Sequence, residues 1–212
     1  MKNLLLTLAL FIVANITRAT DNERFMQAMG QTLMELGKAQ DVTALQEVAN
    51  KFERIASSET VEWLPNYYAA LCYNMIAYKQ KDATEIDKYL DKTDLFIAKL
   101  SKQNVSLLDE VEVLKAQTCM IRIAADGAGR YMKLITIFEN AIDKAKEINP
   151  GNPRAYTLKA SMVYNVPVQF GGGPEKACPE AQEAIVKFAN FKPTSPIAPT
   201  WGFEQVKELA CK

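Results

Sequence analysis

The fold of this chain follows most directly from AIDKAKEINPGNPRAY, which spans residues 141–156. Apolar residues recur at helical spacing on both sides of the INPGNP segment. Pro150 cannot continue the preceding helix, because proline has no backbone N–H and its ring clashes with the turn before it. Pro153 suits the first turn of a following helix, where the missing N–H costs nothing. We therefore predict that one helix ends before Pro150 and another begins at Pro153.

The helical spacing extends from Phe25 to Lys212, and strand-like alternation is hard to find along it. The sequence therefore predicts an all-α fold. Eight of the expected helices pair into four hairpins, and one helix is left over. The helices are expected over residues 22–37, 41–57, 63–80, 84–101, 107–125, 130–148, 153–165, 174–190 and 200–211.

A repeat of about 44 residues runs through these hairpins. Small residues lie midway along the first helix of each hairpin, at Gly30, Cys72, Ala116 and Ala160, with spacings of 42, 44 and 44 residues. A small residue flanked by larger ones lets two helix backbones approach closely. In the third unit a charged residue, Glu112, stands at a flanking position where a large apolar or aromatic side chain is expected, so the repeat is degenerate. We predict four stacked units and a C-terminal capping helix.

The junction at residues 141–156 resembles that between two tetratricopeptide repeats. Ala145 matches the family's small residue near the end of the second helix, and Pro150 matches its interrepeat proline. Tyr156 and Ala160 match the next aromatic and small positions. The resemblance is clearest over residues 138–190, and the units here are longer than the family's repeat of about 34 residues. It implies an α-solenoid whose concave face binds the ligand.

An insertion at residues 166–173 precedes the second helix of the last hairpin. With its Pro and Phe-Gly-Gly elements it resembles a loop of exported bacterial proteins with variant repeats, which are typically binding components of the periplasm or outer membrane. Its three glycines could present backbone amides to an anion. A phosphate loop, however, needs a following Lys-Ser/Thr. We therefore expect a permissive turn that lets Phe170 pack into the core.

The N-terminus has the features of a secretory signal peptide over residues 1–19. A charged start at Met1-Lys2 precedes an apolar run from Leu4 to Val13 and a small residue at Ala19. A membrane anchor is the alternative, but the run falls short of the roughly 20 apolar residues that a spanning helix needs. We expect an exported protein, periplasmic or secreted and not membrane-spanning after cleavage, with a helical-repeat domain over residues 20–212.

The charge balance and the absence of histidine exclude several functions. Without residues 1–19 the chain has 23 basic and 25 acidic residues and no basic block, which argues against nucleic-acid binding. Histidine is absent, which removes the commonest general base and metal ligand. Acidic pairs such as Asp109-Glu110 lie at expected helix starts, where carboxylates favour the positive end of the macrodipole. We expect no enzyme, cofactor or metal site.

The four cysteines suggest packing and one disulfide rather than metal binding. They lack a Cys-x-x-Cys pair, so a zinc site is not expected. Cys72 and Cys119 fall in the packing stripe and are expected to be buried. Cys178 and Cys211 come level if the prolines near residue 193 fold the last helix back onto the eighth. Whether these two form a disulfide or stay free is left open by the sequence.

The resemblance also implies which residues line the ligand-binding groove. In each first helix these are the residues one and four positions after the small residue. These positions are Gln31, Met34, Tyr73, Ile76, Gln117, Met120, Ser161 and Tyr164, with Arg154 at a helix start. The binding candidates drawn from this region are Tyr73, Gln117, Arg154, Ser161, Tyr164 and Asn165. Several of these side chains could instead pack on neighbouring helices, an alternative that stays open.

Two functions are consistent with these features. The first is a binding scaffold of the cell envelope, with a protein or peptide partner in the concave face. The alternative is a carrier that holds an amphiphilic small molecule or lipid in a tunnel between the helices. An enzyme would need a constellation of Lys, Tyr or carboxylates that the sequence does not single out.

Overall fold

The computed structural model describes residues 22–103, 108–209 and 211. The predicted signal peptide lies outside these residues. Regular structure within them is helical, without β-strands, which confirms the predicted all-α class. An N-terminal helix covers residues 22–38. It is followed by α2 (Val42–Ser58), α3 (Leu64–Lys79), α4 (Ala83–Lys102), α5 (Asp109–Ala125), α6 (Gly127–Ile148), α7 (Pro153–Asn165), the 3-10 turn η1 (Val168–Phe170), α8 (Pro174–Asn190) and α9 (Phe203–Leu209).

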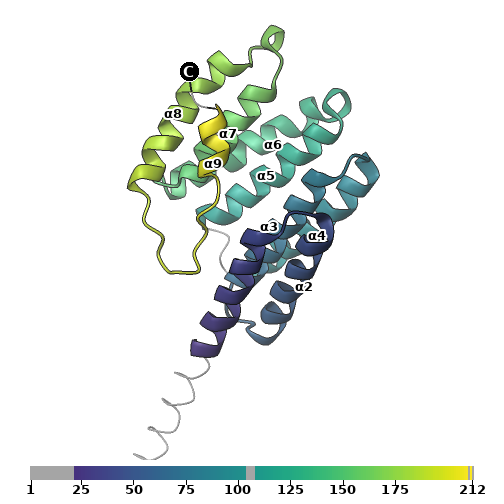
Figure 1. Cartoon of the computed structure of the whole chain (residues 1–212). Helices are drawn as coiled ribbons and strands as arrows, with labels where there is room; N and C mark the ends of the chain where they lie inside the picture. The colour runs from purple at the N-terminus through teal and green to yellow at the C-terminus, as the bar shows by residue number, and fades with distance from the viewer. Residues whose placement is uncertain (1–21, 104–107, 210, 212) are drawn as a thin grey trace, which may run out of the picture.

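The helices stack as antiparallel hairpins, as Figure 1 shows. The pairs α3–α4, α5–α6 and α7–α8 each pack along their length. The N-terminal helix pairs with α2, and an ion pair between Glu35 and Lys51 links them. Among the first helices, α5 also contacts both α3 and α7, and α9 packs on both α7 and α8. The predicted four hairpins and capping helix are therefore confirmed. No helix in the described part of the chain is long and apolar enough to cross a bilayer.

The turn between α6 and α7 forms where the two prolines predict it. Helix α6 ends at Ile148 and α7 begins at Pro153, with Asn152 as its N-cap. The Asn152 side chain accepts a hydrogen bond from the Arg154 backbone N–H at 3.0 Å. Tyr156, one turn into α7, donates its hydroxyl hydrogen to the Pro150 carbonyl at 3.1 Å. Local signals thus fix this junction between the third and fourth units.

Hydrogen bonds between successive units confirm the repeat. Asn74 of α3 donates to Gln117 of α5 at 3.0 Å, and Thr118 of α5 donates to Asn74 at 3.2 Å, across 43 and 44 residues. Gln205 of α9 donates to Ser161 of α7 at 2.9 Å, again across 44 residues. Positions one repeat apart therefore meet between neighbouring first helices. Helix α9 occupies the place that the first helix of a fifth unit would take.

The core follows the small-residue stripe. Cys72, Ala116 and Ala160 are fully buried where first helices approach each other. One cluster of buried apolar side chains surrounds α3, and a second lies among α5, α6, α7 and α8. Trp201, which precedes α9, packs against both clusters. Cys72 and Cys119 are buried free thiols, as predicted.

A buried polar network joins the starts of three first helices, and we call it the Glu110 network. Its centre is the Glu110 carboxylate of α5, which accepts from Arg154 Nε of α7 at 2.8 Å. It also accepts from Asn152 at 2.7 Å and from the Tyr67 hydroxyl of α3 at 2.9 Å. Burial beside this carboxylate raises the pKa of Tyr67, so its hydroxyl remains a donor. The Arg154 side chain is only 2% exposed.

Asp109 and Glu110 lie in the first turn of α5, as predicted, and the Glu110 network gives them a further role. Glu110 is buried and pairs with Arg154, the equivalent residue of the next unit, 44 positions along the chain. Asp109 accepts from the side chains of Asn149 at 2.8 Å and Asn152 at 2.6 Å. Both carboxylates therefore tie α5 to the α6–α7 junction.

An irregular segment, residues 191–202, covers the Glu110 network, and we call it the C-terminal strap. In Figure 1 it leaves the end of α8 as a long loop and returns to α9. Its residue Ile197 is buried and accepts a hydrogen bond from the Tyr68 hydroxyl at 2.8 Å. Trp201 donates to the Tyr67 hydroxyl at 2.9 Å. The Phe191 ring lies 4.6 Å from the Arg154 guanidinium carbon, a cation–π contact.

A second set of ion pairs joins the second and third units. Arg122 of α5 donates to Asp87, Asp91 and Asp94, which line one face of α4, at 2.8 to 3.1 Å. Arg130 of α6 donates two hydrogen bonds to Asp87, at 2.8 and 2.7 Å. The bonds from Arg130 hold the pKa of Asp87 below its usual range. These pairs bring the start of α6 against α4 and α5.

Cys178 and Cys211 form a disulfide, with their Cα atoms 5.2 Å apart. This resolves the alternative that the sequence left open. The bond joins the first turns of α8 to the chain just after α9, across 33 residues. It therefore closes a loop that contains the C-terminal strap and the capping helix.

Replacing Glu110 by Gln should strongly destabilise the fold. The change leaves the buried Arg154 charge without its counter-ion, which typically costs about 3–5 kcal/mol. Chemical denaturation measures the loss. The control is Glu147→Gln, at an exposed position on α6, which should change stability by less than about 0.5 kcal/mol. A loss below about 1 kcal/mol for Glu110→Gln would show that the network is not the central tie.

Removing the disulfide by Cys178→Ser and Cys211→Ser should lower stability by about 3–4 kcal/mol, because the unfolded chain regains the freedom of the closed loop. Denaturation of the native protein with and without reductant checks this. Reductant should bring the native protein to the level of the double variant and leave the variant unchanged. Equal stability of the reduced and oxidised native protein would contradict the role assigned to the bond.

Candidate functional site

The six binding candidates predicted from the sequence lie on three first helices but do not form one open groove. Tyr73 is on α3, Gln117 on α5, and Arg154, Ser161, Tyr164 and Asn165 are on α7. Tyr73, Arg154 and Ser161 are only 1%, 2% and 4% exposed. Neighbouring helices and the C-terminal strap cover them. The expectation that these three line an accessible concave face is therefore corrected.

The polar groups of the buried candidates are occupied by protein partners. Tyr73 donates its hydroxyl hydrogen to Glu53 of α2 and accepts from Gln46 at 3.2 Å. Ser161 accepts from Gln205 of α9 at 2.9 Å. Gln117 is half-buried, and its side-chain oxygen accepts the bond from α3 described above. These side chains therefore join helices to one another. Of the six candidates, the two at the C-terminal end of α7, Tyr164 and Asn165, are exposed.

Tyr164 and Asn165 lie at the exposed C-terminal end of α7. Tyr164 is 39% exposed, and the Asn165 side chain donates to the Ser161 carbonyl at 2.7 Å. The chain then enters η1, where Val168 is 74% exposed and Phe170 is 75% exposed. The expectation that Phe170 packs into the core is wrong, because the turn closes back on the end of α7 and leaves the ring outside.

Three glycines build this turn, as the sequence predicted. Gly171 and Gly173 have φ values of 86° and 99°, which side-chain-bearing residues rarely adopt. A Cβ on Gly172 would lie 2.2 Å from the Val166 carbonyl oxygen, so the two backbone segments touch. The Gly173 N–H donates to the Val163 carbonyl of α7 at 2.9 Å. The turn is therefore tied to α7 and holds Phe170 in a defined place.

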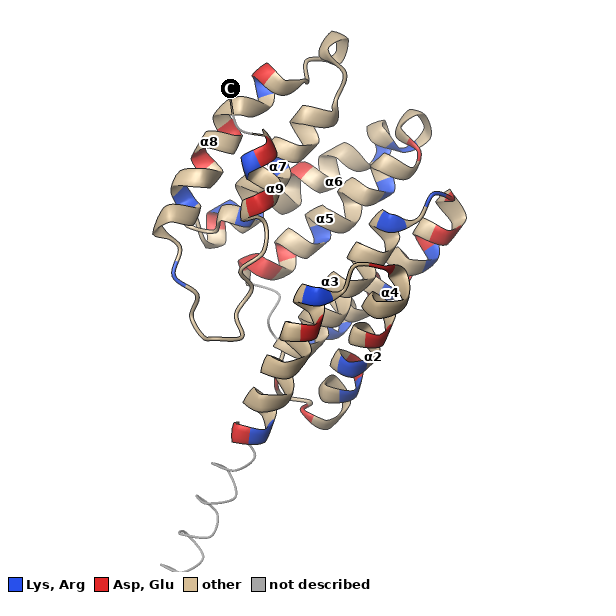
Figure 2. Cartoon of the chain, in the orientation of Figure 1, with Lys and Arg blue, Asp and Glu red and all other residues tan. Residues whose placement is uncertain are grey.

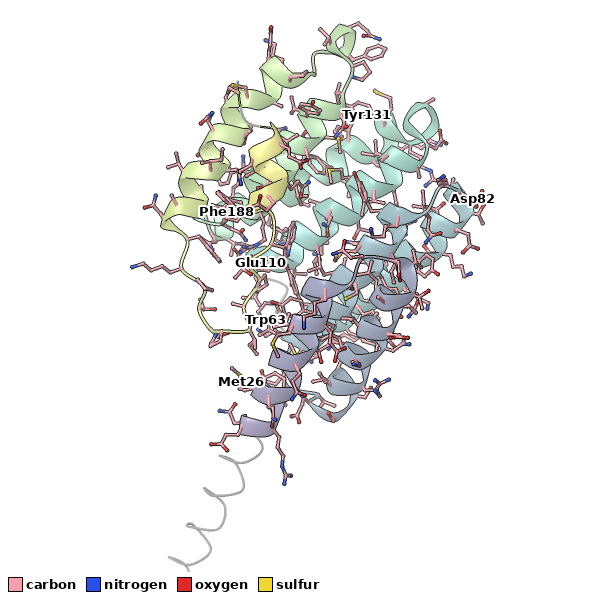
Figure 3. All side chains as sticks on the ribbon, viewed as in Figure 1. Met26, Trp63, Asp82, Glu110, Tyr131 and Phe188 are labelled. Carbon is pink, nitrogen blue, oxygen red and sulfur yellow. A yellow bond between two sulfur atoms is a disulfide. The ribbon has the colours of Figure 1, made fainter. Side chains whose placement is uncertain are left out.

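Met132 of α6 lies at the same end of the molecule. An ion pair between Glu139 of α6 and Lys159 of α7 sets the register of these antiparallel helices. Met132 is two turns before Glu139 on the same stripe, and residue 166 is two turns after Lys159, so we infer that Met132 lies level with the turn. Its side chain is 83% exposed. The neighbouring Tyr131, labelled in Figure 3, lies at this end and is half-buried.

We call Met132, Tyr164, Val168 and Phe170 the apolar edge. The chain has no charged residue between Lys159 and Glu175. Figure 2 accordingly shows the α7–α8 turn in tan, with charges resuming at the start of α8. Other exposed apolar side chains are spread over different helices, mostly beside charged residues; they include Met34, Val61, Tyr78, Leu95, Ile137 and Val186. Exposed apolar groups that gather on a surface with few charges mark a binding surface.

Two other kinds of site are less well supported. A shallow hollow on α2 is lined by Asn50, Glu53, Arg54 and Ser57, all of them polar or charged. In the part of the chain that the structure describes, no group of three or more His, Cys, Asp or Glu side chains is arranged to hold a metal ion. The apolar edge is therefore the candidate functional site, and sequence analysis found its Tyr164 but missed the exposure of Met132 and Phe170.

Comparison with known proteins gives one informative match. No family model and no curated protein matches this chain. Among solved structures, the HusA haemophore from Porphyromonas gingivalis has a TM-score of 0.78 and 28% sequence identity, over 87% of this chain and 90% of that chain. This chain is similar to a haemophore. Membership of the tetratricopeptide family stays a prediction, because no family model matches.

Replacing Gly172 by Ala should disturb the turn that presents Phe170. The added methyl would meet the Val166 and Val163 carbonyl oxygens of the backbone, and we expect a loss of about 1–3 kcal/mol in thermal or chemical unfolding. Gly37→Ala is the control, because a Cβ there meets nothing within 4 Å. Its stability should stay the same or rise slightly. Equal stability of the two variants would contradict a tightly closed turn.

Proposed function

We propose that this chain is an exported carrier that binds a flat, amphiphilic small molecule of the haem class at the apolar edge. The observation that carries the proposal is the similarity to a haemophore over nearly the whole length of both chains. The Cys178–Cys211 disulfide supports export, because such bonds persist in oxidising compartments. We expect the protein in the periplasm or outside the cell.

The chemistry of the apolar edge suits such a ligand. Haem has a broad apolar ring with two carboxylates at one side. The rings of Tyr164 and Phe170 and the thioether of Met132 offer apolar and polarisable contacts to a flat ring. Asn165 and Lys133, both exposed beside these residues, offer polar groups for carboxylates. The turn that carries Phe170 is hydrogen-bonded to α7, and this ordering reduces the entropy cost of binding a ligand.

The structure favours an edge site over the tunnel that the sequence suggested for a carrier. Cys72, Ala116 and Ala160 are packed between neighbouring first helices, so side chains fill the interior of the stack. A peptide groove is also disfavoured, because Tyr73 and Ser161 of the expected concave face are buried. The protein-binding scaffold is therefore the weaker proposal.

Phe170→Ala should weaken haem binding by about tenfold or more, since the ring is an exposed aromatic anchor. Titration of the purified protein with ferric protoporphyrin IX, followed by absorbance, measures the affinity. Leu95→Ala is the matched control, because Leu95 is 64% exposed on α4, and its affinity should equal that of the native protein. Absence of saturable binding by the native protein would contradict the proposed function. Equal affinities of all three proteins would contradict the site.

A further inference from the structure

We propose that the Cys178–Cys211 disulfide is a redox latch that keeps the C-terminal strap and α9 closed over the Glu110 network. When the bond is reduced, residues 191–209 detach from the stack and the four hairpins stay folded. The latch therefore closes only in an oxidising compartment, where disulfides persist. It acts in the same way whatever ligand the chain carries.

The disulfide lies where a reductant can reach it. Cys211 is exposed, and Cys178 is half-buried near the start of α8. A dithiol reductant opens the bond by thiol–disulfide exchange. It passes two electrons and two protons to the two cysteines, which become thiols, while the dithiol itself becomes a disulfide. A disulfide-bearing oxidant closes the bond by the reverse exchange.

Helix α9 depends on this bond because its other contacts are few. It has seven residues, fewer than the roughly 12–15 that an isolated helix needs to be even marginally stable, and Val206 is its buried residue. Gln205 donates the hydrogen bond to Ser161 of α7. The Phe203 ring is 40% exposed and meets the Phe188 ring edge-on, with centroids 5.4 Å apart. We therefore expect α9 to detach once the latch is open.

The strap has little structure of its own to keep it in place. Three of its residues are prolines, which lack the backbone N–H that could tie the segment internally. Ile197 and Trp201 attach it to α3 through one hydrogen bond each. Ordering every residue from 191 to 209 costs conformational entropy, and these attachments offset only part of that cost. The disulfide offsets the rest, because a cross-link restricts the freedom of the detached segment.

The closed strap also leaves one buried donor without a partner. Arg154 Nη1 is buried and makes no hydrogen bond among the described residues. Both ends of the strap lie against this side chain: the Phe191 ring covers the guanidinium, and a Cβ on Gly202 would lie 3.5 Å from Arg154 Cγ. An unsatisfied buried donor is costly, and water satisfies it once the strap opens. This gain favours the open strap whenever the bond is reduced.

The four hairpins should stay folded because other contacts join them. Glu110 accepts hydrogen bonds from Tyr67 of α3 and Arg154 of α7, and none of these residues lies in the released segment. Arg122 of α5 and Arg130 of α6 both donate to Asp87 of α4. Opening of the latch is therefore a local event, of the kind that hydrogen exchange detects.

Hydrogen–deuterium exchange of the purified protein, with and without dithiothreitol, tests the latch by mass spectrometry. After reduction, amides in residues 191–209 should exchange about tenfold or more faster. During the same short labelling, amides of α3 and α7 should stay protected in both states. The double variant Cys178→Ser and Cys211→Ser is the control. It should show the reduced pattern without reductant and should not respond to dithiothreitol.

Two results of this experiment would overturn the latch. If exchange over residues 191–209 is unchanged although both cysteines are shown to be thiols, the strap is closed by its own contacts. If α3 and α7 lose protection together with the strap, the bond holds the whole fold and not this segment.

Trp201→Phe separates the latch from the strap's strongest side-chain attachment, because it removes the indole N–H that binds Tyr67 and keeps an aromatic ring. With the disulfide intact, exchange over residues 191–209 should stay close to that of the oxidised native protein. A rise as large as the one caused by reduction would show that Trp201, rather than the disulfide, keeps the strap closed.

Discussion

The fold depends on one buried ion pair, between Glu110 and Arg154. Neither charge reaches water, and the carboxylate also binds Tyr67 and Asn152. In a low-dielectric interior such a pair depends on its hydrogen bonds: both Glu110 oxygens accept them, whereas Arg154 Nη1 has no hydrogen-bond partner among the described residues. The pair therefore fixes how α3, α5 and α7 stand relative to one another. Trp201 extends the same network to the C-terminal strap.

This network has consequences for the surface at the other end of the helices. The starts of α5 and α7 are locked at the Glu110 network, and the end of α7 is held by α9 through Ser161 and Gln205. The disulfide then keeps the end of the chain at the start of α8. A glycine turn joined to a helix that is fixed along its length can present Tyr164 and Phe170 without large motion.

Much of the fold could be predicted from sequence because its signals are local. Pro150 and Pro153 mark the α6–α7 turn, and the spacing of small residues predicts the units. The Glu110–Arg154 pair was missed because the pairing becomes visible only when residues one repeat apart are compared. The burial of Tyr73 and Ser161 depends on helices and a strap distant in sequence. No local pattern reports those contacts.

The candidate site was predicted only in part for a related reason. Phe170 was expected inside because apolar residues are usually buried, and the interval from residue 160 to 174 is hard to separate from a core segment by composition alone. It contains no charge, and exposure there depends on the turn geometry of Gly171 to Gly173. Met132 joins the site through helix register, which a single sequence does not show.

The most direct test of the account is amide chemical-shift mapping by NMR during titration with metal-free protoporphyrin IX. A carrier that uses the apolar edge should show its largest shift changes at residues 160–174 and 130–133, with few changes in α2 and α4. Saturable changes centred on α2, or on the exposed face of the N-terminal helix, would contradict the placement of the site. Unchanged spectra at saturating porphyrin would contradict the carrier function itself.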